Sequence, residues 1–185
     1  MRTSTGTGFT DAVFVHQETP TTAATPTAFY KSTITWNGNG WNLTLTDGTV
    51  YVFGLEAPLQ AIRDRYGNTV TITHANGQSG TITQVTSPNG RWIRFTYDAS
   101  NRITQAKDNI GRTVAYTYDA NGNLSTVTDP ENGVTTYTYD ASNRLATIKD
   151  GRNIVYLTNQ YLDGRVSTQT LADPSAVYQF TQPAQ

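Results

Sequence analysis

The chain has 185 residues, with 13 Lys and Arg against 14 Asp and Glu, and a formal net charge of -1. This charge supplies no basic field for nucleic acid or anionic lipid, and no apolar stretch approaches the length of a membrane span. The absence of cysteine excludes disulfides, thiol catalysis and thiolate metal sites. The apolar fraction is 36%, below the usual figure of about 45 to 50%. With 11 Tyr, 15 Gly and 3 Trp, the composition favours strands and tight turns, so an all-β fold is expected.

Residues 1–35 are predicted to form an extended N-terminal segment rich in Thr and Pro. Proline removes ladder donors, and the small polar residues between Glu18 and Thr27 offer little to bury. Short strands are expected within it at Ala12–Val15 and at Phe29–Tyr30. The first residues lack the continuous apolar run of a secretory signal, so no export route is visible from them.

Residues 36–185 are predicted to form a repeat domain with a period of about 21 residues. Tyr97, Tyr118 and Tyr139 are evenly spaced at this step, and Asp108, Asp129 and Asp150 are spaced in the same way. Such self-similarity decides the architecture, because each copy is one supersecondary unit.

Each copy is predicted to be a β-hairpin. Val114, Tyr116 and Tyr118 alternate with Ala115 and Thr117, which places the apolar side chains on one face of a strand. The expected aromatic core of the repeats follows from this alternation: Tyr97, Tyr116, Tyr118, Tyr137 and Tyr139. Because a single hairpin is only marginally stable, successive hairpins should pair into one antiparallel sheet, a curved or spiral β-ribbon whose apolar face is buried by curling.

The turns follow the same phase. Gly122 stands where the neighbouring copies have Asn101 and Asn143, and Gly and Asn share a tolerance of positive φ. A left-handed corner is therefore expected at all three positions. Asp98, Asp119 and Asp140 precede these corners and are expected to accept turn amides, as in an Asx turn. Gly111 and Gly133 mark the alternate turns.

Residues 111 to 130, from Gly111 through the Tyr-Thr-Tyr-Asp run to Pro130, resemble the Tyr-Asp repeat of the RHS proteins, which also occurs in insecticidal toxin-complex shells and in teneurins. The resemblance covers about three quarters of the chain, from near Trp41 to near Phe180. It implies a strand-turn-strand ribbon that forms a shell wall around a C-terminal effector, in a secreted or cell-surface protein of bacterial type. Family members that cleave themselves use an Asp-Pro-x-Gly box. Asp173-Pro174-Ser175-Ala176 lacks its glycine, so autoproteolysis is not expected.

No catalytic, metal or cofactor site is expected. His16 and His74 are the only histidines and are interpreted as surface or turn residues. A carboxylate pair for glycoside hydrolysis is conceivable among Glu56, Asp64, Asp108, Asp129 and Asp150, but their recurrence at turns favours a structural role. Arg102, Arg144 and Arg165 follow the corners; they would either bind anions or, as favoured here, lie over Tyr rings and pair with turn aspartates.

Three hypotheses of function remain from the sequence. The leading one is a non-enzymatic wall or scaffold module that contacts further RHS repeats or copies of itself. The second is self-assembly into a filament through open sheet edges, with the segment from Ala12 to Tyr30 as a strap. The third is glycan binding or adhesion through exposed aromatic side chains, chiefly Trp36, Trp41 and Trp92.

Overall fold

The computed structural model describes residues 14–15, 29–56, 58–173 and 175–180. Throughout these residues the secondary structure is strand, turn and bend, with no helix. The all-β prediction is therefore confirmed. The chain divides into two compact units, residues 1–95 and residues 96–185, which are described separately below.

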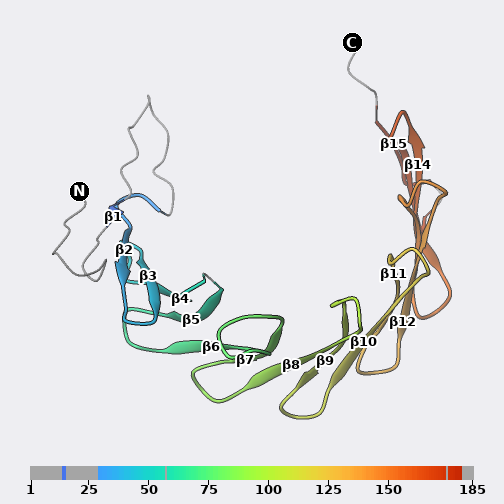
Figure 1. Ribbon diagram of the computed structural model, residues 1–185. Helices are drawn as coiled ribbons and strands as arrows, with labels where there is room; N and C mark the ends of the chain where they lie inside the picture. Colours follow the sequence, from blue (N-terminus) through green and yellow to red (C-terminus); the bar gives the residue numbers. More distant parts are fainter. Residues whose placement is uncertain (1–13, 16–28, 57, 174, 181–185) are drawn as a thin grey trace, which may run out of the picture. The chain divides into compact units, whose positions relative to one another are not determined.

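The first unit is built from consecutive antiparallel strands, each paired with the next one in the chain (Figure 1). They are β1 (Phe14–Val15), β2 (Thr33–Trp36), β3 (Gly40–Thr44), β4 (Val50–Gly54), β5 (Leu59–Arg63), β6 (Thr69–His74), β7 (Ile82–Thr86) and β8 (Trp92–Tyr97), the last of which runs across the division. Phe29 and Tyr30 form a turn, so the prediction of a strand at these residues was wrong. Ala12 and Val13 lie outside the described residues.

The second unit repeats this arrangement with longer and more regular hairpins. Its strands are β9 (Ile103–Asp108), β10 (Thr113–Tyr118), β11 (Leu124–Thr128), β12 (Val134–Tyr139), β13 (Leu145–Lys149), β14 (Val155–Leu162), β15 (Arg165–Leu171) and β16 (Val177–Gln179). From β9 to β16, each strand pairs with the next in antiparallel register. The prediction of repeated antiparallel hairpins is confirmed.

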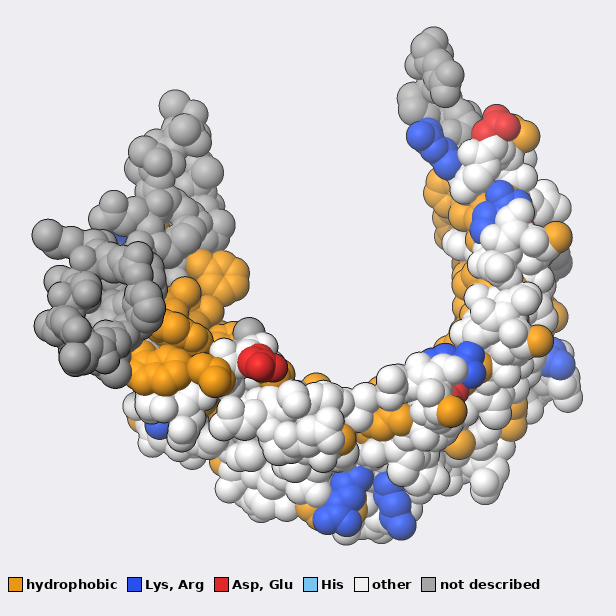
Figure 2. Space-filling view, viewed as in Figure 1, with side chains coloured by type: hydrophobic (Ala, Val, Ile, Leu, Met, Phe, Trp, Pro, Cys, Tyr) orange, Lys and Arg blue, Asp and Glu red, His pale blue; other side chains and the backbone are white. Residues whose placement is uncertain are grey.

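The two faces of the sheet differ in chemistry. In the first unit Trp41 lies opposite Phe53 and Leu43 opposite Tyr51, which makes an apolar face, and Figure 2 shows hydrophobic side chains gathered there. The other face carries rows of threonine and other polar residues, because side chains alternate along each strand. In the second unit Tyr116 lies opposite Val127, while Thr117 and Thr126 meet on the other face with their Oγ1 atoms 2.6 Å apart.

The sheet forms one layer and encloses almost nothing. Within the described residues Ile72, at 9% exposure, is the single buried hydrophobic side chain. The expected burial of the apolar face is therefore wrong for the described residues, since no second layer of these residues covers it. The five repeat tyrosines are half-buried instead. Tyrosine suits this position because it contributes contact area while its hydroxyl reaches a polar partner.

Candidate functional site

The repeated turns have one shared geometry. At the turn after β8, the amide of Asp98 donates to the carbonyl of Arg102 at 2.9 Å, and the amide of Asn101 donates back to the carbonyl of Asp98 at 3.1 Å. The turns that start at Asp119 and Asp140 repeat both bonds. Asn101, Gly122 and Asn143 have φ values of 58°, 86° and 58°, the left-handed corner that the 21-residue phase predicts. This pattern is that of a hairpin turn closed by a left-handed residue.

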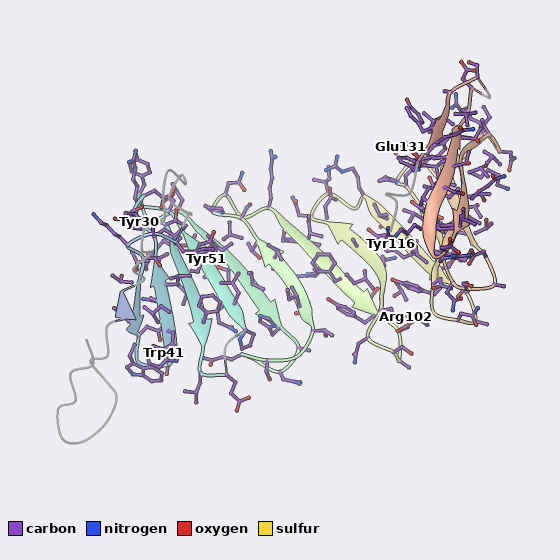
Figure 3. The ribbon with its side chains drawn as sticks, turned by 90° about the horizontal axis from the view of Figure 1, so that it is seen from above. Tyr30, Trp41, Tyr51, Arg102, Tyr116 and Glu131 are labelled. Atoms are coloured by element: carbon purple, nitrogen blue, oxygen red, sulfur yellow. The ribbon has the colours of Figure 1, made fainter. Side chains whose placement is uncertain are left out.

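The alternate turns, which connect the other ends of the strands, have the same hydrogen bonds. Gly111 is the left-handed residue of the first, with φ of 95°. In the next turn Asn132 takes this role, with φ of 66°, and Gly133 follows it. Gly133 occupies the position that Arg102, Arg112 and Arg144 hold in other turns, and a Cβ there would lie 2.5 Å from Oδ2 of Asp129, so the Asp129 side chain would have to shift. Arg102 and Glu131, which belong to the two kinds of turn, are labelled in Figure 3.

An aspartate opens each of these turns and fixes it. Oδ1 of Asp98 accepts the amides of Ser100 and Arg102 at 2.8 and 3.0 Å, and Oδ2 accepts Nε of Arg102 at 2.7 Å. The same two amide bonds recur at six further aspartates: Asp64, Asp108, Asp119, Asp129, Asp140 and Asp150. These bonds favour the ionised form.

The pKa values of Asp98 and Asp140 follow from these bonds. The backbone amide of Arg102, followed by its side chain, holds the pKa of Asp98 below its ordinary value. At Asp140 the side chain of Arg144 and then its backbone amide lower the pKa in the same way. A general acid would instead need a raised pKa. The carboxylates considered for glycoside hydrolysis at positions 64, 108, 129 and 150 accept turn amides through their Oδ1 atoms, as Asp98 does.

Tyrosine hydroxyls connect successive hairpins. The hydroxyl of Tyr118 donates to the carbonyl of Ile103 at 2.7 Å, and that of Tyr139 donates to the carbonyl of Leu124 at 3.0 Å. Tyr161 donates to the carbonyl of Leu145 at 2.8 Å. The step from Tyr118 to Tyr139 and from Ile103 to Leu124 is the 21-residue period. The tyrosines therefore form a column of equivalent bonds through the second unit.

Arginine side chains join this column to the turns. The guanidinium of Arg102 lies over the ring of Tyr118, with its Cζ 4.5 Å from the ring centroid, while its Nε holds Asp98. Arg144 does the same between Asp140 and Tyr161, at 4.4 Å. Both arginines therefore make the two contacts favoured from the sequence. In the copy between them, Asn123 bonds Asp119 and reaches Oδ1 of Asn143 at 3.1 Å.

Tyr161 is the member of this column that the sequence analysis missed. It lies 22 residues after Tyr139, one residue out of phase, because β14 is longer than the other strands of the unit. The register shift between Ile148 and Lys149, where the pairing passes from Leu157 to Val155, absorbs the extra residue of β14 and returns the Tyr161 side chain to the column. The available signal was the recurrence of Tyr before Leu162 and the Asp163-Gly164 corner.

The three tryptophans do not form one site. Trp36 and Trp41 meet edge to face, with ring centroids 5.2 Å apart, and both are half-buried. Trp92 is also half-buried and lies under the guanidinium of Arg94, 4.3 Å from Cζ to the ring centroid. Residues paired directly across neighbouring strands lie on the same face of the sheet. The successive partners from Trp92 are Thr86, Thr71, Ala61, Val52 and Asn42. Trp92 therefore lies on the face with the threonine rows, called the threonine face below, and Trp41 lies on the opposite, apolar face.

The interpretation of His74 as a surface or turn residue was wrong. It ends β6, is 7% exposed, and has both ring nitrogens close to carbonyl oxygens: Nδ1 lies 3.1 Å from Gly80 and Nε2 lies 2.9 Å from Leu59. It therefore ties the loop after β6 to the start of β5. His16 lies outside the described residues.

The part of the chain that the structure describes contains neither a metal-binding cluster nor a membrane-spanning helix. Groups of three or more His, Cys, Asp or Glu side chains that could hold a metal ion do not occur there. That part also contains no helix long and apolar enough to cross a membrane.

These contacts define a class of protein, an antiparallel repeat protein in which turns, arginines and tyrosines recur along one sheet. Comparison with family models identifies the repeat: residues 78–112, 97–134 and 118–154 each match the RHS Repeat family. Residues 78 to 154 therefore match the RHS repeat that the resemblance implied. A comparison with curated proteins finds no match.

Solved structures share the fold. A crystal structure of TcdB2-TccC3 without the hypervariable C-terminal region aligns with 79% of this chain at 14% identity and a TM-score of 0.52. A Tc holotoxin pore of Photorhabdus luminescens with a TccC3 mutation aligns with 76% of the chain at 14% identity and a TM-score of 0.45. The chain spans only 9% of the length of each of these proteins.

Proposed function

We propose that this chain is a non-enzymatic structural module, a wall segment of an RHS-type secreted or cell-surface protein. The observation that carries the proposal is the recurring contact set of turn aspartate, arginine and tyrosine, which uses the charged side chains to hold hairpins in register. The RHS Repeat match and the fold shared with TcdB2-TccC3 support a structural role.

The proposed partners are further RHS repeats of the parent protein and an enclosed C-terminal effector. The solved relative is described as lacking a hypervariable C-terminal region, which motivates the second partner. Because this chain spans 9% of that relative, a single copy would contribute a small part of such a wall.

A wall that shields cargo must resist proteases, and the arginine-containing turns allow a direct test. Trypsin cleaves after arginine and needs an extended substrate. Arg112 instead lies at a hairpin turn, where its Nε donates to Oδ2 of Asp108 at 2.7 Å. We expect the native chain to remain intact at Arg112 and Arg152 under conditions that digest the urea-unfolded chain. Asp108→Ala should open the turn and expose Arg112 selectively, with Arg152 as the internal control. Rapid native cleavage after Arg112 in the unmodified chain would contradict a wall role.

Self-assembly is a second candidate, favoured by one observation at β16. Val177, Tyr178 and Phe180 are 44%, 54% and 50% exposed, and β16 pairs only with β15 among the described strands. An open, apolar edge strand is a template for pairing with another chain. Light scattering before and after deletion of residues 1–30 tests whether that segment serves as the strap. A monomer in both cases would exclude assembly.

Glycan binding through tryptophan remains a prediction for Trp36 and Trp41, which lie together on the apolar face. Loss of glycan-array binding in Trp41→Ala, with folding retained, would support it. Absence of binding across the array would leave the structural role alone.

A further inference from the structure

A pocket lies on the threonine face of the first unit, opposite the paired tryptophans. Its floor is Val52 and Gly54 of β4, and its walls include Asn42 of β3, Gln60 and Arg63 of β5, and Gln78 from the loop after β6. Asn42 and Val52 are paired across β3 and β4, so they share this face. Five of the nine lining residues are Asn or Gln, and Arg63 is the one charged residue among them.

The polar walls are held in place by the fold. Nε2 of Gln60 donates to the carbonyl of Gln78 at 3.0 Å and to that of Pro58 at 3.1 Å. His74, more than nine-tenths buried, bridges the same two segments through the carbonyls of Leu59 and Gly80. Gly54 lets the Gln78 side chain lie close to β4, because a Cβ there would be 3.0 Å from its Oε1. The loop that carries Gln78 is therefore fixed against β5.

Several groups of this pocket have unused hydrogen-bonding capacity within the described residues. Oδ1 of Asn42 accepts from Nδ2 of Asn37 at 3.0 Å, which leaves Nδ2 of Asn42 as a donor. The side chain of Gln60 keeps Oε1 as an acceptor. The side-chain amide of Gln78 has no hydrogen-bond partner in the described part of the chain. Arg63 has no ion pair there either. This contrasts with Arg102, Arg112, Arg144 and Arg152, which are paired with aspartates.

We propose that this pocket binds a sugar that carries a carboxylate, such as a uronic acid residue of a surface polysaccharide. A guanidinium presents two parallel N–H groups to a carboxylate, which gives Arg63 the anionic end of the ligand. Amides offer a donor and an acceptor together, the combination that neighbouring sugar hydroxyls require. Val52 supplies apolar contact for the C–H face of the ring. The site is separate from the tryptophans and independent of the wall role.

Calorimetric titration of the full chain with sodium glucuronate, glucose and acetate tests the site. We expect glucuronate to bind more tightly than either glucose or acetate, because only glucuronate uses both the guanidinium and the amides. Arg63→Gln should weaken glucuronate binding by roughly 10-fold or more, in line with the loss of a charge-assisted hydrogen bond, and leave the response to glucose unchanged. Gln78→Ala should weaken both sugars.

Arg91→Gln is the matched control, since Arg91 is an exposed arginine of the same unit outside the pocket. It should leave all three titrations unchanged, and thermal unfolding should show that each variant is folded. Equal losses in Arg63→Gln and Arg91→Gln would overturn the proposal, as would equal binding of glucuronate and acetate. Absence of glucuronate binding at roughly 10 mM ligand would also overturn it.

Discussion

At the scale of single residues, the left-handed corner at Gly122 sets a strict limit on substitution. A β-branched side chain is poorly accommodated at its φ of 86°, and an added Cβ would lie 3.0 Å from Nη1 of Arg102. Gly122→Val should therefore reduce the free energy of unfolding by more than about 1 kcal/mol. Asn101→Gly, at the equivalent corner, should be neutral or mildly stabilising. Urea denaturation of the two variants checks this contrast, and equal destabilisation would contradict it.

The buried histidine makes a second prediction at this scale. His74→Leu keeps the apolar contacts but removes the ring nitrogens that lie beside the carbonyls of Leu59 and Gly80. Loss of about 1 to 3 kcal/mol is expected, the usual cost of an unsatisfied buried polar group. His74→Gln, which keeps one amide donor, should lose less. Urea denaturation, monitored by Trp fluorescence, gives the free energy of unfolding of both variants. An equal loss of stability in His74→Leu and His74→Gln would show that hydrogen bonding by this side chain does not contribute.

At the scale of the hairpin, the tyrosine column is expected to hold neighbouring copies in register. Tyr118→Phe removes the 2.7 Å bond to the carbonyl of Ile103 and should cost about 0.5 to 1.5 kcal/mol. Tyr116→Phe is the matched control in the same strand, because the Tyr116 hydroxyl makes no hydrogen bond with the described residues. Chemical denaturation should separate the two variants. Indistinguishable stabilities would mean that the column contributes by ring packing alone.

The turns should also make stability depend on pH. The pKa values of Asp98 and Asp140 are lowered in the folded chain, so their ionised forms stabilise it at pH values above the unfolded pKa. This contribution is lost as pH falls through the folded pKa. Denaturation midpoints measured from neutral pH to about pH 3 should therefore decrease on acidification, and the decrease should be smaller in Asp98→Asn. A midpoint that is constant or rises with acid would contradict this coupling.

The sequence determined the hairpins and turns more reliably than their environment. The phase of Asn101, Gly122 and Asn143 predicted the corner because φ is a local property that residue type constrains directly. The surroundings of His74 depend on carbonyls 15 and 6 residues away, and backbone acceptors have no signature in the sequence. The pocket at Arg63 was missed for the same reason, since its amides come from segments that only the register brings together.

At the scale of the whole chain, the repeats behave as interchangeable units if their contacts are truly periodic. Deleting residues 119–139 joins Tyr118 to Asp140, which restores the Tyr-Asp junction of the turn that the deletion removes. The contact of Arg102 with Tyr118 and the bond of Tyr161 to Leu145 both lie outside the deleted residues. Because repeat stability is approximately a sum of local and nearest-neighbour terms, this variant should fold cooperatively with slightly reduced stability.

Deletion of residues 119–138 is the matched control, since it removes one residue fewer. It leaves Tyr139 directly after Tyr118, and β10 has no register shift like the one at the start of β14 to absorb this extra residue in the strand. The later side chains should therefore lose their register with the preceding hairpin. We expect this variant to show a broad unfolding transition and a weaker strand signal in circular dichroism. The 21-residue deletion should keep a sharp transition. If the two deletions were equally stable, the hairpins would be held together by general apolar contact, and the aspartate, arginine and tyrosine contacts would have no role in setting their register.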